Sequence, residues 1–106
     1  MHASQIIEKS NLIVIKIGTA LVVDTQTALV KSGWLTALAQ DVQALKQRGK
    51  KIVIVSSGAV ALGRSAMGIS LKDRPSSIPL EIKQAASAVG QYHLFNAYQQ
   101  AFAQLE

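Results

Sequence analysis

Two apolar segments, each ending in a turn of small residues, constrain the fold of this chain more than any other feature. The first spans Leu12–Ile17 and runs into Gly18 and Thr19, and the second spans Lys51–Val55 and runs into Ser56–Ala59. Continuous runs rich in valine and isoleucine are typical of strands buried in a parallel sheet. In open α/β sheets the carboxyl ends of the strands form the ligand-binding edge, so both turns are candidate binding sites.

Helical spacing and turn residues predict the elements around these strands. We expect a short helix over Ser4–Lys9, a hairpin over Ala20–Val30, a helix over Gly33–Arg48 capped by Ser32, a helix from Ala59 to Gly68, an exposed loop over Ser70–Pro79 and a long final helix after Pro79. The final helix contains Gly90, which costs about 1 kcal/mol relative to alanine, so we expect close packing there. This order predicts an α/β fold with parallel strands joined by a right-handed crossover.

The number of strands bears on the domain organisation. Two strands make a marginal sheet whose edges are unpaired. The final helix reaches Glu106 without a glycine, asparagine or proline stop signal. We therefore expect residues 1–106 to be the N-terminal portion of one larger α/β domain, with a further strand after the final helix.

Composition excludes several classes of protein. Apolar residues make up 49% of the 106 residues, which fits a packed core, and the absence of cysteine excludes disulfides and thiolate metal sites. His2 and His93 lie far apart without clustered partners, so we expect no metal site built by the chain. No apolar run approaches the roughly 18 residues of a membrane span, and the N-terminus lacks signal-peptide features. We expect a cytoplasmic protein that makes no membrane contact.

The formal net charge is +5, and four of the basic residues form a cluster: Lys46, Arg48, Lys50 and Lys51. This cluster has two interpretations. One is a surface that binds nucleic acid, since clustered cations bind phosphates. The other is a solvated helix end, where cations complement the helix dipole. We favour the second, because no aromatic side chain interleaves with the charges and no RNA-binding signature is present, so a nucleic-acid partner is not expected.

The first turn contains the one charge inside an apolar strand, Lys16. Lysine supplies a compact positive charge, and Gly18 lets backbone N–H groups approach phosphate oxygens closely. The sequence contains neither the Walker A loop nor the dinucleotide-binding glycine pattern. A phosphate site is one interpretation of this turn, and an exposed lysine at a strand end without a ligand is the other.

The second turn opens directly into a helix, whose first N–H groups lack internal partners and attract anions. Alternatively, a serine caps the helix and Gly58 only tightens the turn. A serine hydrolase is disfavoured, because the Gly-x-Ser-x-Gly motif is absent and no Asp or His is placed to complete a triad. Adjacent parallel strands would bring both turns together into one pocket with two anion sites, which suits a phosphate donor and an acidic acceptor.

Three segments carry a resemblance to a known family: Val14–Thr19, Ile52–Gly63 and Lys83–Gln91. Together they resemble the amino acid kinase family, and most specifically its glutamate-phosphorylating members. The resemblance covers the chain from about Asn11 onward. The first segment is common to many amino acid kinases, whereas the second and third are more specific.

The resemblance implies a three-layer αβα fold with a mainly parallel sheet. It also implies an activity, in which ATP, bound with Mg²⁺, phosphorylates the side-chain carboxylate of L-glutamate to give glutamyl 5-phosphate, the first step of proline biosynthesis. L-Glutamate and ATP are then the partners, and the full-length protein is expected to be a homo-oligomer.

Residue by residue, the resemblance implies that Lys16 is catalytic, contacting the ATP phosphates and the transferred phosphoryl group. Gly18 and Thr19 would line the same phosphate site. This sequence departs from the family at Ala20, where a serine is common, which removes a small polar contact near the phosphates.

The same resemblance implies that Ser57 binds glutamate, with backbone support from Gly58 and Ala59. The family's kinase domain is more than twice this long, and many members add a C-terminal PUA domain, so we expect this chain alone not to be an active kinase. Two alternatives stay open: the kinase half of a bifunctional pyrroline-5-carboxylate synthase, and a non-catalytic anion-binding α/β module.

Overall fold

The computed structural model describes residues 2–105. Its elements run in the order α1 (Ala3–Lys9), β1 (Leu12–Ile17), α2 (Thr19–Val22), α3 (Ser32–Gln47), β2 (Lys51–Ser56), α4 (Ala59–Ala66), the 3₁₀ helix η1 (Pro75–Ser77) and α5 (Leu80–Ala103). No helix in this part of the chain is long and apolar enough to cross a membrane. The arrangement confirms the predicted α/β class.

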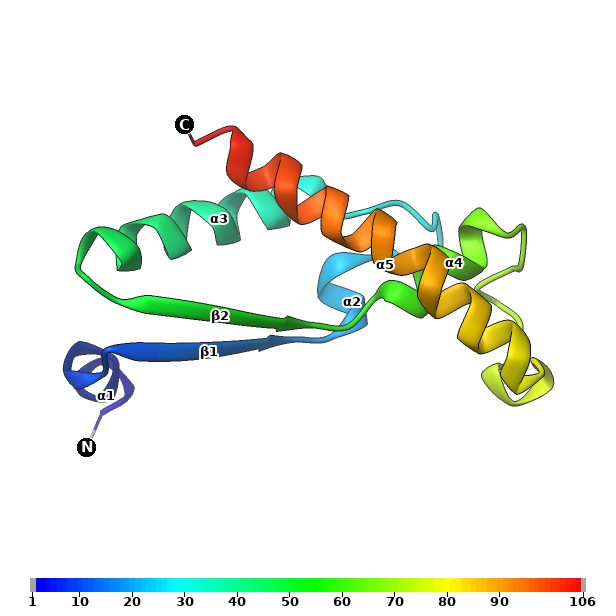
Figure 1. The fold of residues 1–106 in the computed structure, drawn as a ribbon, viewed down its shortest axis with the longest axis horizontal. Coiled ribbons are helices and arrows are strands. Elements are labelled where there is room, and N and C mark those ends of the chain that lie inside the picture. The colour runs from blue at the N-terminus through cyan, green and yellow to red at the C-terminus, as the bar shows by residue number, and fades with distance from the viewer. Residues whose placement is uncertain (1, 106) are drawn as a thin grey trace.

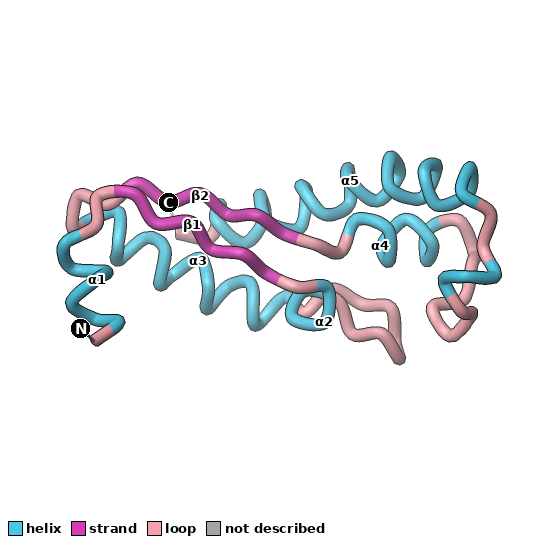
Figure 2. The backbone as a smooth tube through the Cα atoms, turned by 90° about the horizontal axis from the view of Figure 1, so that it is seen from below, coloured by secondary structure: helices cyan, strands magenta, loops and turns pink. Residues whose placement is uncertain are grey.

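The two strands pair in parallel, with Leu12 opposite Lys51 at one end and Ile17 opposite Ser56 at the other. Helices α3 and α5 lie on one face of this sheet (Figures 1 and 2). Ile17 is buried on that face, and the core cluster around it includes Trp34 from α3 and Leu94 from α5. Because successive side chains of a strand point to opposite faces, every second residue of the strand lies on the core side.

The opposite face of the sheet is uncovered among residues 2–105. Four apolar side chains on it are between 46% and 60% exposed: Leu12, Val14, Val53 and Val55. The described residues thus form two layers, one sheet and one set of helices. The third layer that the family resemblance implies is not among them.

Helices α4 and α5 approach each other so closely that backbone touches backbone. A Cβ atom on Gly63 would lie 1.7 Å from the carbonyl oxygen of Ala86, and one on Gly90 would lie 1.6 Å from that of Ala59. No side chain fits at either point. The expectation of close packing at Gly90 is therefore confirmed, and the neighbour is α4.

The predicted hairpin over Ala20–Val30 is wrong for the most part. Its first half is the helix α2, and an isolated antiparallel bridge between Val23 and Val30 is all that remains of the pairing. The turn within it is stabilised by Asp24, whose carboxylate accepts hydrogen bonds from the backbone N–H groups of Gln26 (2.9 Å) and Thr27 (3.2 Å). A short apolar run fits a helical turn as well as a strand, and here the backbone hydrogen bonds are those of a helix.

Several predicted boundaries also shift. Lys31, not Ser32, precedes the first turn of α3, and no side-chain cap bond forms there. The carbonyl of Ser32 instead accepts a hydrogen bond from the Thr36 hydroxyl (3.0 Å). Helix α4 ends at Ala66 and α5 at Ala103, each before the predicted limit.

The basic cluster ties α1 to the turn between α3 and β2. Arg48 forms an ion pair with Glu8, and Lys50 Nζ donates hydrogen bonds to the carbonyl oxygens of Glu8 (2.6 Å) and Ser10 (2.7 Å). Arg48 and Lys50 therefore contact α1 within the chain.

The contact between α4 and α5 yields a prediction about stability. The variant Gly90→Ala forces the helices apart, so we expect the free energy of unfolding to fall by about 1–3 kcal/mol. Gly33→Ala in α3 is the control, because its Cβ would meet open space and alanine favours helix by up to about 1 kcal/mol. Urea titration followed by circular dichroism measures both, and equal effects would contradict the close contact.

Candidate functional site

The register of the sheet brings the two predicted turns side by side. Lys16 pairs with Val55 and Ile17 with Ser56, so both strands end at the same level. The N–H of Ser57 then donates to the carbonyl of Ile17 at 2.8 Å, which continues the contact one residue beyond the strands. The two turns therefore form one edge, as the parallel-strand argument predicts.

Lys16 lies on the uncovered face of the sheet, beside its register partner Val55. The residue is exposed, and no hydrogen bond or ion pair is recorded for its ammonium group within residues 2–105. Its place is set by strand alternation, which directs Ile15 and Ile17 into the core and Lys16 away from it. The charge is thus available to an anionic ligand at the end of β1.

Gly18 and Thr19 form the turn that follows Lys16. Gly18 has φ −78° and ψ 162°, an extended conformation that any residue adopts, and a Cβ atom there would meet nothing within 4 Å. Its value to the site is therefore open space next to the backbone rather than conformational freedom. Thr19 is the first residue of α2 and is half-buried.

Ser57, Gly58 and Ala59 connect β2 to α4. Gly58 occupies the cap position with φ +118°, in the left-handed region that favours glycine. No side-chain cap bond forms at this helix start, so the serine-cap interpretation is not what the geometry shows. Ser57 is exposed, and among the described residues its hydroxyl has no recorded hydrogen bond.

The electrostatics of this edge favour an anion. The first turn of α4 contains no acidic residue, and its leading N–H groups precede the first internal helix bond, from Leu62 to the carbonyl of Gly58 (3.0 Å). Helix N-termini carry partial positive charge. Together with Lys16, these amides can stabilise negative charge on ligands bound across the two turns.

Sequence reasoning missed one polar contact behind this edge. The Tyr98 hydroxyl on α5 lies 2.8 Å from Ser56 Oγ, and Ser56 Oγ lies 2.8 Å from the carbonyl oxygen of Ser57. Burial raises the pKa of Tyr98 above its ordinary value, because the phenolate is costly away from water. In the sequence Tyr98 is one residue of the long final helix, and it lies 42 positions from the residue to which it is bonded.

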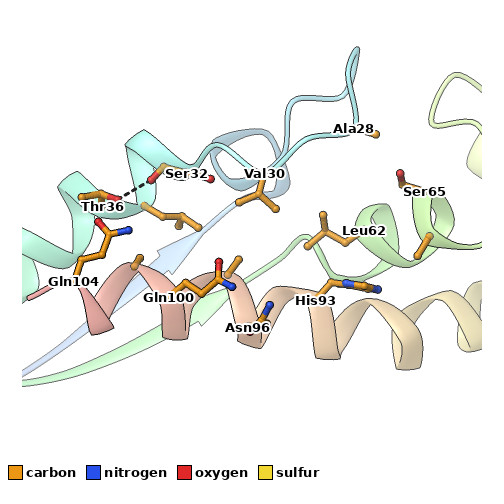
Figure 3. A pocket seen from close by; sticks show the side chains of 14 residues that line it. Ala28, Val30, Ser32, Thr36, Leu62, Ser65, His93, Asn96, Gln100 and Gln104 are labelled. Carbon is orange, nitrogen blue, oxygen red and sulfur yellow. Dashed lines mark hydrogen bonds between the residues drawn. The ribbon is translucent and has the colours of Figure 1, made fainter.

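A separate cavity of about 410 Å³ lies between α3, α4 and α5 (Figure 3). Its polar lining includes Ser32, Ser65, His93, Asn96 and Gln100. None of the residues of the two turns lines it. The cavity is therefore distinct from the edge where the sequence predicts ligands.

The two turn glycines give contrasting predictions for stability. Gly58→Ala places a side chain in a left-handed conformation, so we expect a loss of about 1–2 kcal/mol in the free energy of unfolding. Gly18→Ala changes neither conformation nor packing, so we expect a change within about 0.5 kcal/mol. Chemical denaturation compares the two variants, and a large loss in Gly18→Ala would contradict the open environment described above.

The raised pKa of Tyr98 predicts a pH dependence. Above the unfolded value of about 10 the unfolded chain loses the phenol proton first, so the folded chain binds more protons and the free energy of unfolding falls as pH rises. Below that pH both states keep the phenol proton, so Tyr98 adds no pH dependence to the free energy of unfolding. Absorbance titration of a Tyr92→Phe variant reports Tyr98 alone, and a midpoint at or below that of a free tyrosine amide would contradict the burial.

Comparison with known proteins identifies the family of this chain. The profile of the amino acid kinase family matches residues 11–106. A glutamate 5-kinase from Ruegeria sp. is 50% identical over 91 residues, covering 86% of this chain, and one from Rhizobium rhizogenes is 45% identical over 102 residues, covering 95%. The chain spans 24% and 25% of those relatives' own lengths. The family match extends over most of the sequence, and this chain belongs to the amino acid kinase family.

Proposed function

We propose that this chain supplies the phosphate site and the acceptor site of an ATP-dependent kinase acting on the side-chain carboxylate of L-glutamate. The observation that carries the proposal is the adjacency of the two turns, joined by the bond from Ser57 N–H to the Ile17 carbonyl. Among residues 2–105, one turn offers an ammonium group without a partner, and the other offers a hydroxyl without a partner and helix N-terminal amides. The relatives named glutamate 5-kinase support this choice of donor and acceptor.

The proposed chemistry needs positioning and charge neutralisation more than covalent help from the protein. A carboxylate oxygen of glutamate attacks the γ-phosphorus of ATP, the bond from that phosphorus to the bridging oxygen breaks, and ADP leaves. Lys16 neutralises charge on the transferred phosphoryl group, and Gly18 and Thr19 leave room for the phosphates beside the backbone. The product is glutamyl 5-phosphate, which places the reaction first in proline biosynthesis.

The acceptor would be held at the start of α4. The hydroxyl of Ser57 donates to glutamate, and the N–H groups of Gly58 and Ala59 face negative charge at the helix N-terminus. A kinase must bring two anionic substrates together, and their like charges repel each other. Cationic and amide groups on both sides of the reacting atoms reduce that repulsion.

Mg²⁺ fits this proposal only as part of the nucleotide complex. No group of three or more acidic or histidine residues within residues 2–105 could hold a metal ion. Mg²⁺ is commonly bound through substrate phosphates with few protein ligands. We therefore assign the cation to the ATP phosphates and derive no step from it.

We further infer that residues 1–106 are the N-terminal portion of one amino acid kinase domain. The match to about a quarter of each relative's length supports a partial domain, and the uncovered sheet face is consistent with one. The remaining ligands for the nucleotide and for glutamate would then come from residues outside this sequence. The kinase half of a bifunctional pyrroline-5-carboxylate synthase is the alternative whole-protein setting.

A hybrid enzyme tests the proposal. The segment of the Ruegeria enzyme that aligns with this chain is replaced by the corresponding residues of this chain, and glutamate-dependent ADP formation is measured. We expect the hybrid to be active, and Lys16→Ala to lower kcat by at least about 100-fold, because a donor to the transferred group is lost.

Lys51→Ala is the matched control for Lys16→Ala. Lys51 is also an exposed strand lysine, but it pairs with Leu12 at the opposite end of the sheet. We expect its removal to leave kcat unchanged. Equal losses in the two variants would contradict a specific role for Lys16, and binding of ATP by the hybrid without turnover would favour the non-catalytic anion-binding module.

A further inference from the structure

The backbone of Ser57 is fixed from two sides. Its N–H donates to the carbonyl of Ile17 on β1 (2.8 Å), and its own carbonyl accepts a hydrogen bond from Ser56 Oγ (2.8 Å). These two bonds orient the peptide groups on either side of Ser57. The direction of its side chain and the start of α4 depend on that orientation.

The Ser56 hydroxyl cannot hold this position by itself, because a serine side chain chooses among staggered rotamers at little cost. The Tyr98 hydroxyl donates to Ser56 Oγ at 2.8 Å, so Ser56 accepts from α5 while it donates to Ser57. Making both bonds at once favours the one rotamer in which Ser56 Oγ lies within reach of both partners. Three groups thus form a chain of hydrogen bonds from α5 to the turn.

The phenol of Tyr98 is itself held in place. Its ring packs against both core clusters of the molecule, one containing Leu94 and the other Ala101. Helix α5 is in turn locked against α4 by the contact of Gly90 with the Ala59 carbonyl. The position of the hydroxyl is therefore determined by the core rather than by the exposed edge.

We propose that Tyr98 is a positioning residue for the acceptor site, which acts through the Ser56 hydroxyl to fix the Ser57 carbonyl and so the direction of the Ser57 side chain. This inference rests on the proposed function, because it assigns Ser57 to glutamate. Tyr98 itself faces the covered side of the sheet with Ser56, whereas Lys16 lies on the open side. Its effect should therefore fall on glutamate and not on ATP.

The expected effect is moderate. A cavity of about 280 Å³ borders Ser56, Leu94 and Tyr98, so water can reach the Ser56 hydroxyl when the phenol is removed. Loss of one neutral hydrogen bond then weakens the orientation of Ser57 without abolishing it. We expect Tyr98→Phe to raise the KM for glutamate about three- to tenfold in the hybrid enzyme.

The kinetic test compares two variants on α5. Tyr98→Phe keeps the ring and removes the hydroxyl, and Tyr92→Phe is the matched control, since Tyr92 is 71% exposed. We expect Tyr98→Phe to raise the KM for glutamate while the KM for ATP stays constant, and Tyr92→Phe to change neither. An unchanged KM for glutamate in Tyr98→Phe, or equal rises for both substrates, would overturn the inference.

A second measurement separates this inference from the proposed function. Backbone amide spectra of the hybrid enzyme report the Ser57 turn directly, without activity. We expect Tyr98→Phe and Ser56→Ala to move the amide signals of Ser57 and Gly58, with the double variant adding nothing to either single change. Shifted amides with an inactive hybrid would contradict the proposed function alone, and unmoved amides would overturn the relay.

Discussion

The contact between α4 and α5 is the constraint on which the rest of the molecule depends. At Gly63 and Gly90 the two helices meet backbone to backbone, and any side chain there would overlap a carbonyl oxygen. This contact places α5 against the turn between β2 and α4, so that Leu94 reaches the buried Gly58 and the phenol of Tyr98 reaches Ser56. Further along, α5 packs on α3 and completes the second core cluster.

The two faces of the sheet serve different purposes. The covered face supplies rigidity, since Ile17 is buried there and Ser56 is bonded to α5. The open face presents Lys16 at the end of β1. The proposed reaction uses both, because the phosphoryl group is neutralised from an accessible side while the acceptor is held by a turn that is hydrogen-bonded to β1.

Much of this arrangement could be predicted from local patterns. The bounds of β1 follow from its apolar run, and the cost of a glycine inside a helix pointed correctly to close packing at Gly90. The helix Thr19–Val22 was missed because a short, mainly apolar run does not distinguish helix from strand. Tyr98 was missed for another reason: its partner lies on a distant segment, and periodicity along one helix does not show contacts made across the fold.

The uncovered face of the sheet also governs how this chain behaves in solution. Exposed side chains such as Val14 and Val53 form apolar surface beside unpaired strand edges. Any contact that covers this surface removes it from water and is favoured by mass action. Stability comparisons between variants of the isolated chain therefore require matched protein concentrations.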